Sequence, residues 1–295
     1  MMRQAQVHEE GRRALRRGLA AAVAATILLA LVHLWLGDFE AGGVHWFHLD
    51  RERNLPTWFS GVAFLSIGLA ALVAYTRELQ WLERHERPAR PCRPWLVVAL
   101  IAFALSLDEV TVLHENLFWR EFRRVTFESQ GPLRFVTQWQ ALFAPLIVLL
   151  LLFFVSFFAQ RFAASRPPRT MAYGGIGCWI LALAFEGARG LFKLAGEPMY
   201  RAEVVAEEML ELWGALLIAA AIARYGLDIA WGESGVARQA LSGRYFLAGR
   251  RSLLPAVVTA LALISAGAGI YSAAREQQRR GAPLPHLFER ALGSS

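Results

Sequence analysis

The stretch that decides the fold is PWLVVALIAFALSLDEVTVLHENLFW, residues 94–119, a long apolar run interrupted by four ionisable side chains. These side chains are Asp108, Glu109, His114 and Glu115. Hydrocarbon offers them no hydrogen bonds and little charge screening, so they are costly inside a bilayer. Membrane proteins that contain such groups direct them toward one another, toward a metal ion or toward a water-filled cavity. The stretch therefore predicts a membrane-spanning helix that contributes to a functional site.

The composition of the whole chain favours a membrane protein. Of its 295 residues, 56% are hydrophobic, and the mean hydropathy is +0.35. About 20 apolar residues cross a bilayer core as a helix. Seven segments qualify, at residues 18–36, 57–75, 94–119, 136–159, 171–194, 203–224 and 253–273. We therefore predict an all-α, polytopic transmembrane helix bundle of about seven spans, with one transmembrane domain over residues 18–273.

The charges outside the spans predict topology and partners. The net charge is +7, and Lys193 is the only lysine among the basic residues. Such a balance suggests nucleic-acid binding in a soluble protein, but here the arginines lie between apolar runs, where they set topology and meet anionic lipid head groups. We therefore expect membrane lipids as partners and no nucleic acid. The arginine distribution predicts that the N-terminal segment, residues 1–17, is cytoplasmic. Residues 274–295 are predicted to form a polar tail after the last span. We expect the protein to lie in a bacterial inner (cytoplasmic) membrane.

In this topology the acidic and histidine side chains of different spans fall into one layer. The polar half of the third span, Glu186 of the fifth span and the acidic residues of 203–224 all belong to the outer halves of their helices, as does His33 of the first. The first outer loop adds the histidines of GGVHWFHLDRE, residues 42–52. The inner halves carry almost no acidic residue or histidine. We therefore predict that these groups meet at one depth.

Helical spacing selects the members of this layer. On a continuous third helix, 100° per residue places Glu115 within about 20° of Asp108, with Glu109 and His114 on opposite flanks. On the sixth helix, acidic residues lie at i, i+3 and i, i+4 and share a face. Carboxylates and imidazole from neighbouring helices suit a divalent metal ion such as Fe, Mn or Zn. The predicted metal ligands are Asp108, Glu115, Glu186, Glu207, Glu208 and Glu211, and His114 and Glu109 are the predicted catalytic residues.

These patterns predict an integral membrane metal-binding protein with its site in the outer half of the bundle. If it is an enzyme, we expect metal-activated chemistry on a lipid or another small apolar substrate. A cation- or proton-coupled transporter or channel would use the same carboxylates, and a structural subunit of a membrane complex is a third alternative. The competing structural interpretation is that the carboxylates form ion pairs, for example Glu186 with Arg189 at i+3. The sequence leaves the oligomeric state and the identity of the metal open.

Overall fold

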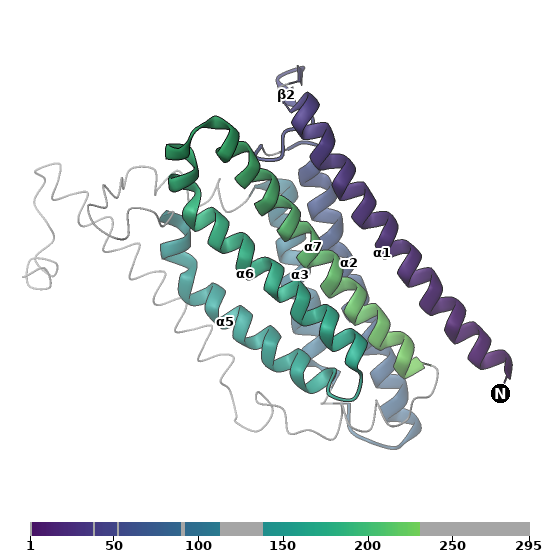
Figure 1. The fold of residues 1–295 in the computed structure, drawn as a ribbon. Coiled ribbons are helices and arrows are strands. Elements are labelled where there is room, and N and C mark those ends of the chain that lie inside the picture. Colours follow the sequence, from purple (N-terminus) through teal and green to yellow (C-terminus); the bar gives the residue numbers. More distant parts are fainter. Residues whose placement is uncertain (1, 38, 52, 90–91, 113–137, 231–295) are drawn as a thin grey trace, which may run out of the picture.

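The computed structural model describes residues 2–37, 39–51, 53–89, 92–112 and 138–230, which form an all-helical bundle with one small β-hairpin (Figure 1). The helices are α1 (Met2–Leu36), α2 (Leu55–Arg84), α3 (Pro94–Thr111), α5 (Gln138–Arg161), α6 (Arg166–Ala195) and α7 (Glu197–Ala230). The hairpin joins β1 (Glu40–Ala41) to β2 (Val44–His45) in antiparallel register. The predicted span at 253–273, the tail at 274–295, His114 and Glu115 lie outside the described residues.

Four of the described helices are long and apolar enough to cross a membrane. They cover residues 6–36, 55–84, 94–111 and 166–189. This result agrees with a membrane protein built from transmembrane helices. The total of seven spans and the cytoplasmic N-terminus remain predictions.

Successive helices run in alternating directions, and α7 lies at the centre of the packing (Figure 1). It packs against α6, α2 and α1, while α3 packs on α2 and α5 packs on α6. Buried aromatic side chains fill the core, among them Trp95, Phe158 and Tyr225. The α1 helix lies at the edge of the bundle against α7 alone, apart from weaker contacts. Aliphatic side chains such as Leu28 and Leu31 are more than half exposed there, as expected of a helix that faces lipid.

Local sequence explains where several elements begin and turn. The side chain of Asn54 caps α2 by accepting a hydrogen bond from the Thr57 N–H at 3.1 Å. Pro94 starts α3, a position where its missing N–H costs nothing. Gly42 and Gly43, with φ of 64° and 79°, form the hairpin turn, which requires positive φ at both central residues.

The third predicted span is interrupted earlier than we expected. The α3 helix ends at Thr111, because Val112 adopts a left-handed conformation with φ of 55°. A β-branched residue rarely adopts this conformation, and the sequence has no glycine or asparagine here that would predict it. The predicted alignment of Asp108 with Glu115 assumed a continuous helix to residue 119, and because Glu115 lies outside the described residues, this alignment stays a prediction.

Small residues bring α6 and α7 into close backbone contact. A Cβ atom on Gly175 would lie 2.7 Å from the Gly214 carbonyl oxygen, and one on Gly214 would lie 2.9 Å from the Gly175 carbonyl oxygen. No real side chain fits at these distances. Glycines at this crossing are therefore what allows the two helices to place their acidic residues side by side.

Candidate carboxylate site

The candidate site is centred on Arg189, near the end of α6. Its guanidinium forms ion pairs with Asp50 at 3.3 Å, with Glu203 at 3.4 Å and with Glu207. The Tyr200 hydroxyl donates a hydrogen bond of 2.7 Å to the other carboxylate oxygen of Asp50. The loop before α2 is thus joined to both α6 and α7.

These ion pairs leave the site rich in negative charge. Glu203 and Glu207 are 1% and 4% exposed, so water does little to stabilise their charges. One guanidinium cannot neutralise three carboxylates. One oxygen of Glu203, Oε2, is buried with no hydrogen-bond partner among the described residues. The site is therefore electrostatically incomplete around Arg189.

Further carboxylates lie within electrostatic reach of this centre. Glu208 experiences repulsion from Glu211, Glu207, Glu109 and Asp50. Glu207 in turn experiences repulsion from Glu186 as well as from Glu211. The structure thus places five of the predicted residues, from α3, α6 and α7, in one neighbourhood: Glu109, Glu186, Glu207, Glu208 and Glu211.

The structure says less about the other predicted site residues. Asp108 is half-buried in the last turn of α3, where its carbonyl oxygen accepts the 2.6 Å hydrogen bond from Val112. The predicted residues His114 and Glu115 are not among the described ones. Within the described part of the chain, no group of three or more His, Cys, Asp or Glu residues is arranged to hold a metal ion. The metal ligand set therefore stays a prediction.

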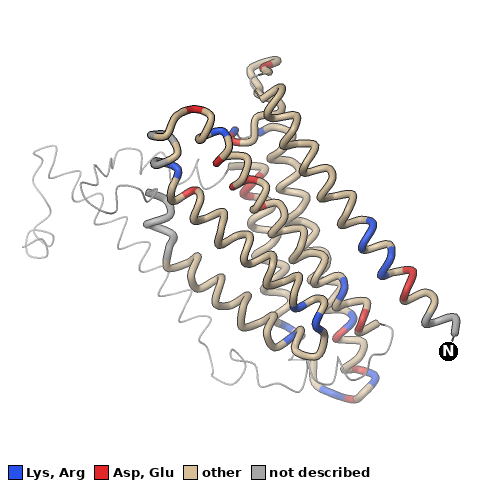
Figure 2. The backbone as a smooth tube through the Cα atoms, in the orientation of Figure 1, with Lys and Arg blue, Asp and Glu red and all other residues tan. Residues whose placement is uncertain are grey.

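Charged residues also gather at the opposite end of the bundle (Figure 2), where the sequence led us to expect arginines but almost no acidic residues. Glu78 of α2 is fully buried and accepts hydrogen bonds from Trp95 at 2.7 Å and Tyr225 at 2.6 Å. Its second oxygen lies 3.3 Å from the guanidinium of Arg161, which is also fully buried. The predicted spans ended at residues 75 and 159 and included neither side chain, whereas the helices α2 and α5 continue to Arg84 and Arg161.

A second ion-pair cluster at this end is centred on Asp228, which is 1% exposed. It accepts hydrogen bonds from Arg12 at 2.9 Å, Arg224 at 3.0 Å and Ser165 at 3.2 Å, and His8 lies 3.4 Å away. These contacts tie the first turns of α1 to the last turns of α7. They also explain why residues 2–17, predicted as a separate segment, continue α1.

Comparison with known sequences places this bundle in a family. Residues 18–225 match a family described as a domain of unknown function, DUF8692. The chain belongs to this family. No curated protein and no solved structure matches the chain. The DUF8692 region contains Arg189 with its three carboxylates, and also the buried pair of Glu78 and Arg161.

Proposed function

We propose that this DUF8692 protein is an integral membrane protein that binds a cation in the carboxylate layer around Glu208. One observation carries the proposal. Glu208 is surrounded by the negative charges of Glu207, Glu211, Glu109 and Asp50, and it makes no hydrogen bond or ion pair to any described residue. A carboxylate in such surroundings needs a positive partner or a proton, because repulsion and loss of water both disfavour its charge.

Arg189 does not supply that partner. Its guanidinium is occupied by Asp50, Glu203 and Glu207. We therefore divide the layer into two parts. Arg189 holds the loop and the helices together, and Glu208 lies within electrostatic reach of Glu109 and Glu211.

A divalent metal ion is our first candidate for the cation. Glu208 and Glu211 share a helix face at i, i+3, and Glu109 approaches from α3. Carboxylate ligands suit Fe, Mn or Zn, and a histidine such as the predicted His114 would complete the set. A metal there would supply Lewis-acid chemistry toward a lipid or another apolar substrate in a bacterial inner membrane. The catalytic roles of Glu109 and His114 belong to this proposal.

A proton is the second candidate, and two observations favour it. No metal-holding group of three or more side chains occurs among the described residues. Buried acidic residues also lie at the opposite end of the bundle, at Glu78 and Asp228. A proton-coupled transporter needs titratable groups toward both faces of the membrane. In that case Glu208 would gain and lose a proton during transport.

Elemental analysis of the purified full chain tests both candidates. The wild type is compared with Glu208→Gln and with a control, Glu83→Gln, whose side chain is exposed at the end of α2. We expect stoichiometric Fe, Mn or Zn in the wild type and the control, and its loss in Glu208→Gln. A metal-free wild type whose proton uptake into liposomes is lost in Glu208→Gln would select the second candidate. If Glu208→Gln changed neither metal content nor proton uptake, the proposal would be refuted.

A further inference from the structure

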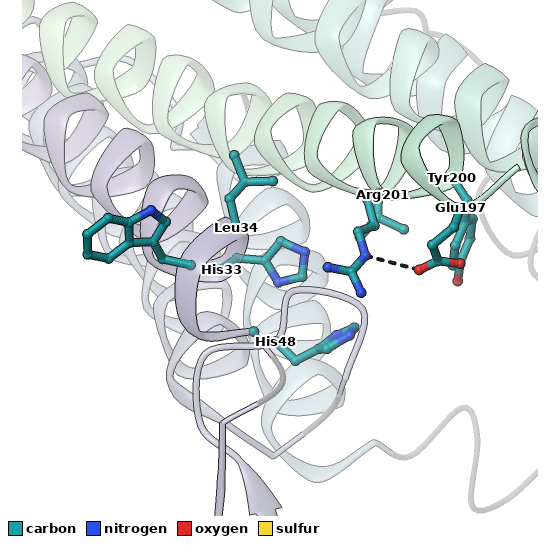
Figure 3. A pocket seen from close by; sticks show the side chains of 9 residues that line it. His33, Leu34, His48, Glu197, Tyr200 and Arg201 are labelled. Carbon is teal, nitrogen blue, oxygen red and sulfur yellow. Dashed lines mark hydrogen bonds and ion pairs between the residues drawn. The ribbon is translucent and has the colours of Figure 1, made fainter.

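A pocket of about 90 Å³ lies beside the carboxylate site, between the end of α1, the loop before α2 and the first turns of α7 (Figure 3). His33 and His48 line it from one side, and Tyr200 and Arg201 line it from the other. Figure 3 shows the two imidazole rings and the guanidinium directed toward the same space. A cavity needs about 10–15 Å³ of such space to hold one water molecule, so the pocket has room for several water molecules or for a compact polar group.

A hydrogen bond from the backbone of Leu49 orients His33 in this pocket. The side chain is 7% exposed, and its Nδ1 accepts a 3.2 Å hydrogen bond from the backbone N–H of Leu49. A neutral imidazole that accepts at Nδ1 carries its proton on Nε2, which makes Nε2 a hydrogen-bond donor. A Cβ atom on Gly37 would lie 2.8 Å from Nδ1, so the glycine leaves room for this arrangement. The His48 ring packs edge-on against His33 at 4.9 Å between centroids.

Arg201 adds a positive charge to these donors. Its Nε donates a 3.0 Å hydrogen bond to Glu197, four residues earlier on α7. Both side chains of this pair are at least half exposed, at 51% and 67%. An ion pair so exposed contributes little free energy. A ligand with a higher negative charge and more acceptor oxygens can therefore displace Glu197 from the guanidinium.

The residues around the pocket indicate which kind of molecule would present such an anionic group. Trp35, which also lines the pocket, is 90% exposed, and its neighbour Leu34 is 54% exposed. Tryptophan at the end of an apolar helix typically lies at the membrane interface, which is the depth of phospholipid phosphates. An arginine among the lining residues disfavours a metal cation, and the guanidinium fork matches phosphate oxygens. We infer that this pocket binds a phosphate group, and that a membrane phospholipid presents it.

The pocket contacts the carboxylate site through Tyr200, but phosphate binding in the pocket does not require cation binding at Glu208. Tyr200 lines the pocket while its hydroxyl donates to Asp50, which pairs with Arg189. The phosphate inference uses only Arg201, the histidines and the exposed apolar residues. It therefore stands or fails separately from cation binding at Glu208.

Ligand-dependent thermal unfolding of the full chain in detergent tests the inference. The probes are a short-chain phosphatidylglycerol, the diacylglycerol with the same acyl chains, and inorganic phosphate. A ligand that binds only the folded protein raises the unfolding midpoint in a saturable way. We expect such a rise with phosphatidylglycerol and none with diacylglycerol. Arg201→Gln should weaken binding at least tenfold, Arg201→Lys should weaken it less, and Glu197→Gln should strengthen it severalfold.

The chain provides a matched control at the other end of the bundle. Arg13 and Glu9 form a similar exposed ion pair at i, i+4 on α1, and Arg13→Gln should leave binding unchanged. A saturable rise with inorganic phosphate of equal affinity would keep the phosphate site and assign it to free phosphate in place of lipid. The inference would be overturned if Arg201→Gln bound phosphatidylglycerol as tightly as the wild type. It would also be overturned if diacylglycerol bound equally well, or if neither phosphate probe bound.

Discussion

Replacement of Arg161 by methionine should destabilise the bundle strongly, although no predicted site residue is touched. Arg161 and Glu78 are both fully buried, with 3.3 Å between guanidinium and carboxylate. In Arg161→Met the Glu78 carboxylate keeps the hydrogen bonds from Trp95 and Tyr225 but loses this cation. Removal of one partner from a buried ion pair typically costs about 3–5 kcal/mol. We expect a loss of that size in the free energy of unfolding.

The double variant Glu78→Gln/Arg161→Met separates the ion pair from packing. A glutamine oxygen can still accept from Trp95 and Tyr225, and no buried charge remains. The remaining cost is an unsatisfied amide group, about 1–3 kcal/mol. The double variant should therefore be more stable than Arg161→Met alone, and the coupling energy between the two substitutions should reach about 2 kcal/mol or more.

Reversible unfolding in detergent, followed by circular dichroism or tryptophan fluorescence, measures these differences. Arg166→Met, at an exposed arginine at the start of α6, is the control and should change stability by less than about 0.5 kcal/mol. The reasoning is refuted if Arg161→Met costs less than about 1 kcal/mol, or if the effects of Glu78→Gln and Arg161→Met simply add.

Three further changes probe other parts of the molecule. Gly214→Ala would place a Cβ atom 2.9 Å from the Gly175 carbonyl oxygen and should lower the free energy of unfolding by about 1–3 kcal/mol. Asp228→Asn removes the charge that holds Arg12, so hydrogen exchange should become faster in residues 2–17 than in the rest of α1. Burial, and to a lesser degree the charge of Glu78, raises the pKa of the Cys92 thiol. The thiolate population at pH 8 is therefore reduced, and iodoacetamide should alkylate Cys92 much more slowly in the folded protein than after unfolding.

Each of these expectations has an outcome that contradicts it. Wild-type stability of Gly214→Ala would mean that α6 and α7 are not in the described contact. Unchanged exchange in Asp228→Asn would show that the first turns of α1 are held by other interactions. Equal alkylation rates of Cys92 before and after unfolding would show that the thiol is accessible, contrary to its exposed fraction of 0%.

Hydropathy located the described helices but not their ends. A window count treats each charged residue as a cost whatever its partner, so Glu78 and Asp228 were excluded from the predicted spans. In the structure α2 and α7 continue to Arg84 and Ala230 and bury both residues. One of the groups that stabilise buried Glu78, the Tyr225 hydroxyl, lies 147 residues away in sequence. No local pattern contains that information.

The candidate site shows the same division between local and distant information. Spacing predicted that the carboxylates of α7 share a face, and the competing ion-pair interpretation offered Arg189 as a partner for Glu186 at i+3. The structure pairs Arg189 with Asp50, which lies 139 residues away, and with Glu203 and Glu207 on the next helix. The left-handed residue Val112 is a similar case, because nothing in its neighbours' identities predicts the end of α3.

The two charged layers are separated by a distance that places the candidate site relative to a membrane. Between Glu207 and Asp228, α7 rises by about 32 Å at 1.5 Å per residue, which is close to the 30 Å thickness of a bilayer core. The residues between them on this helix include no acidic or basic side chain from Leu212 to Ala223. We therefore expect α7 to span the membrane with one charged layer at each interface. Glu208 then lies near the head groups of one leaflet, about 10 Å along α7 from Arg201, so a cation from water and a phosphate from lipid can reach the same end of the bundle.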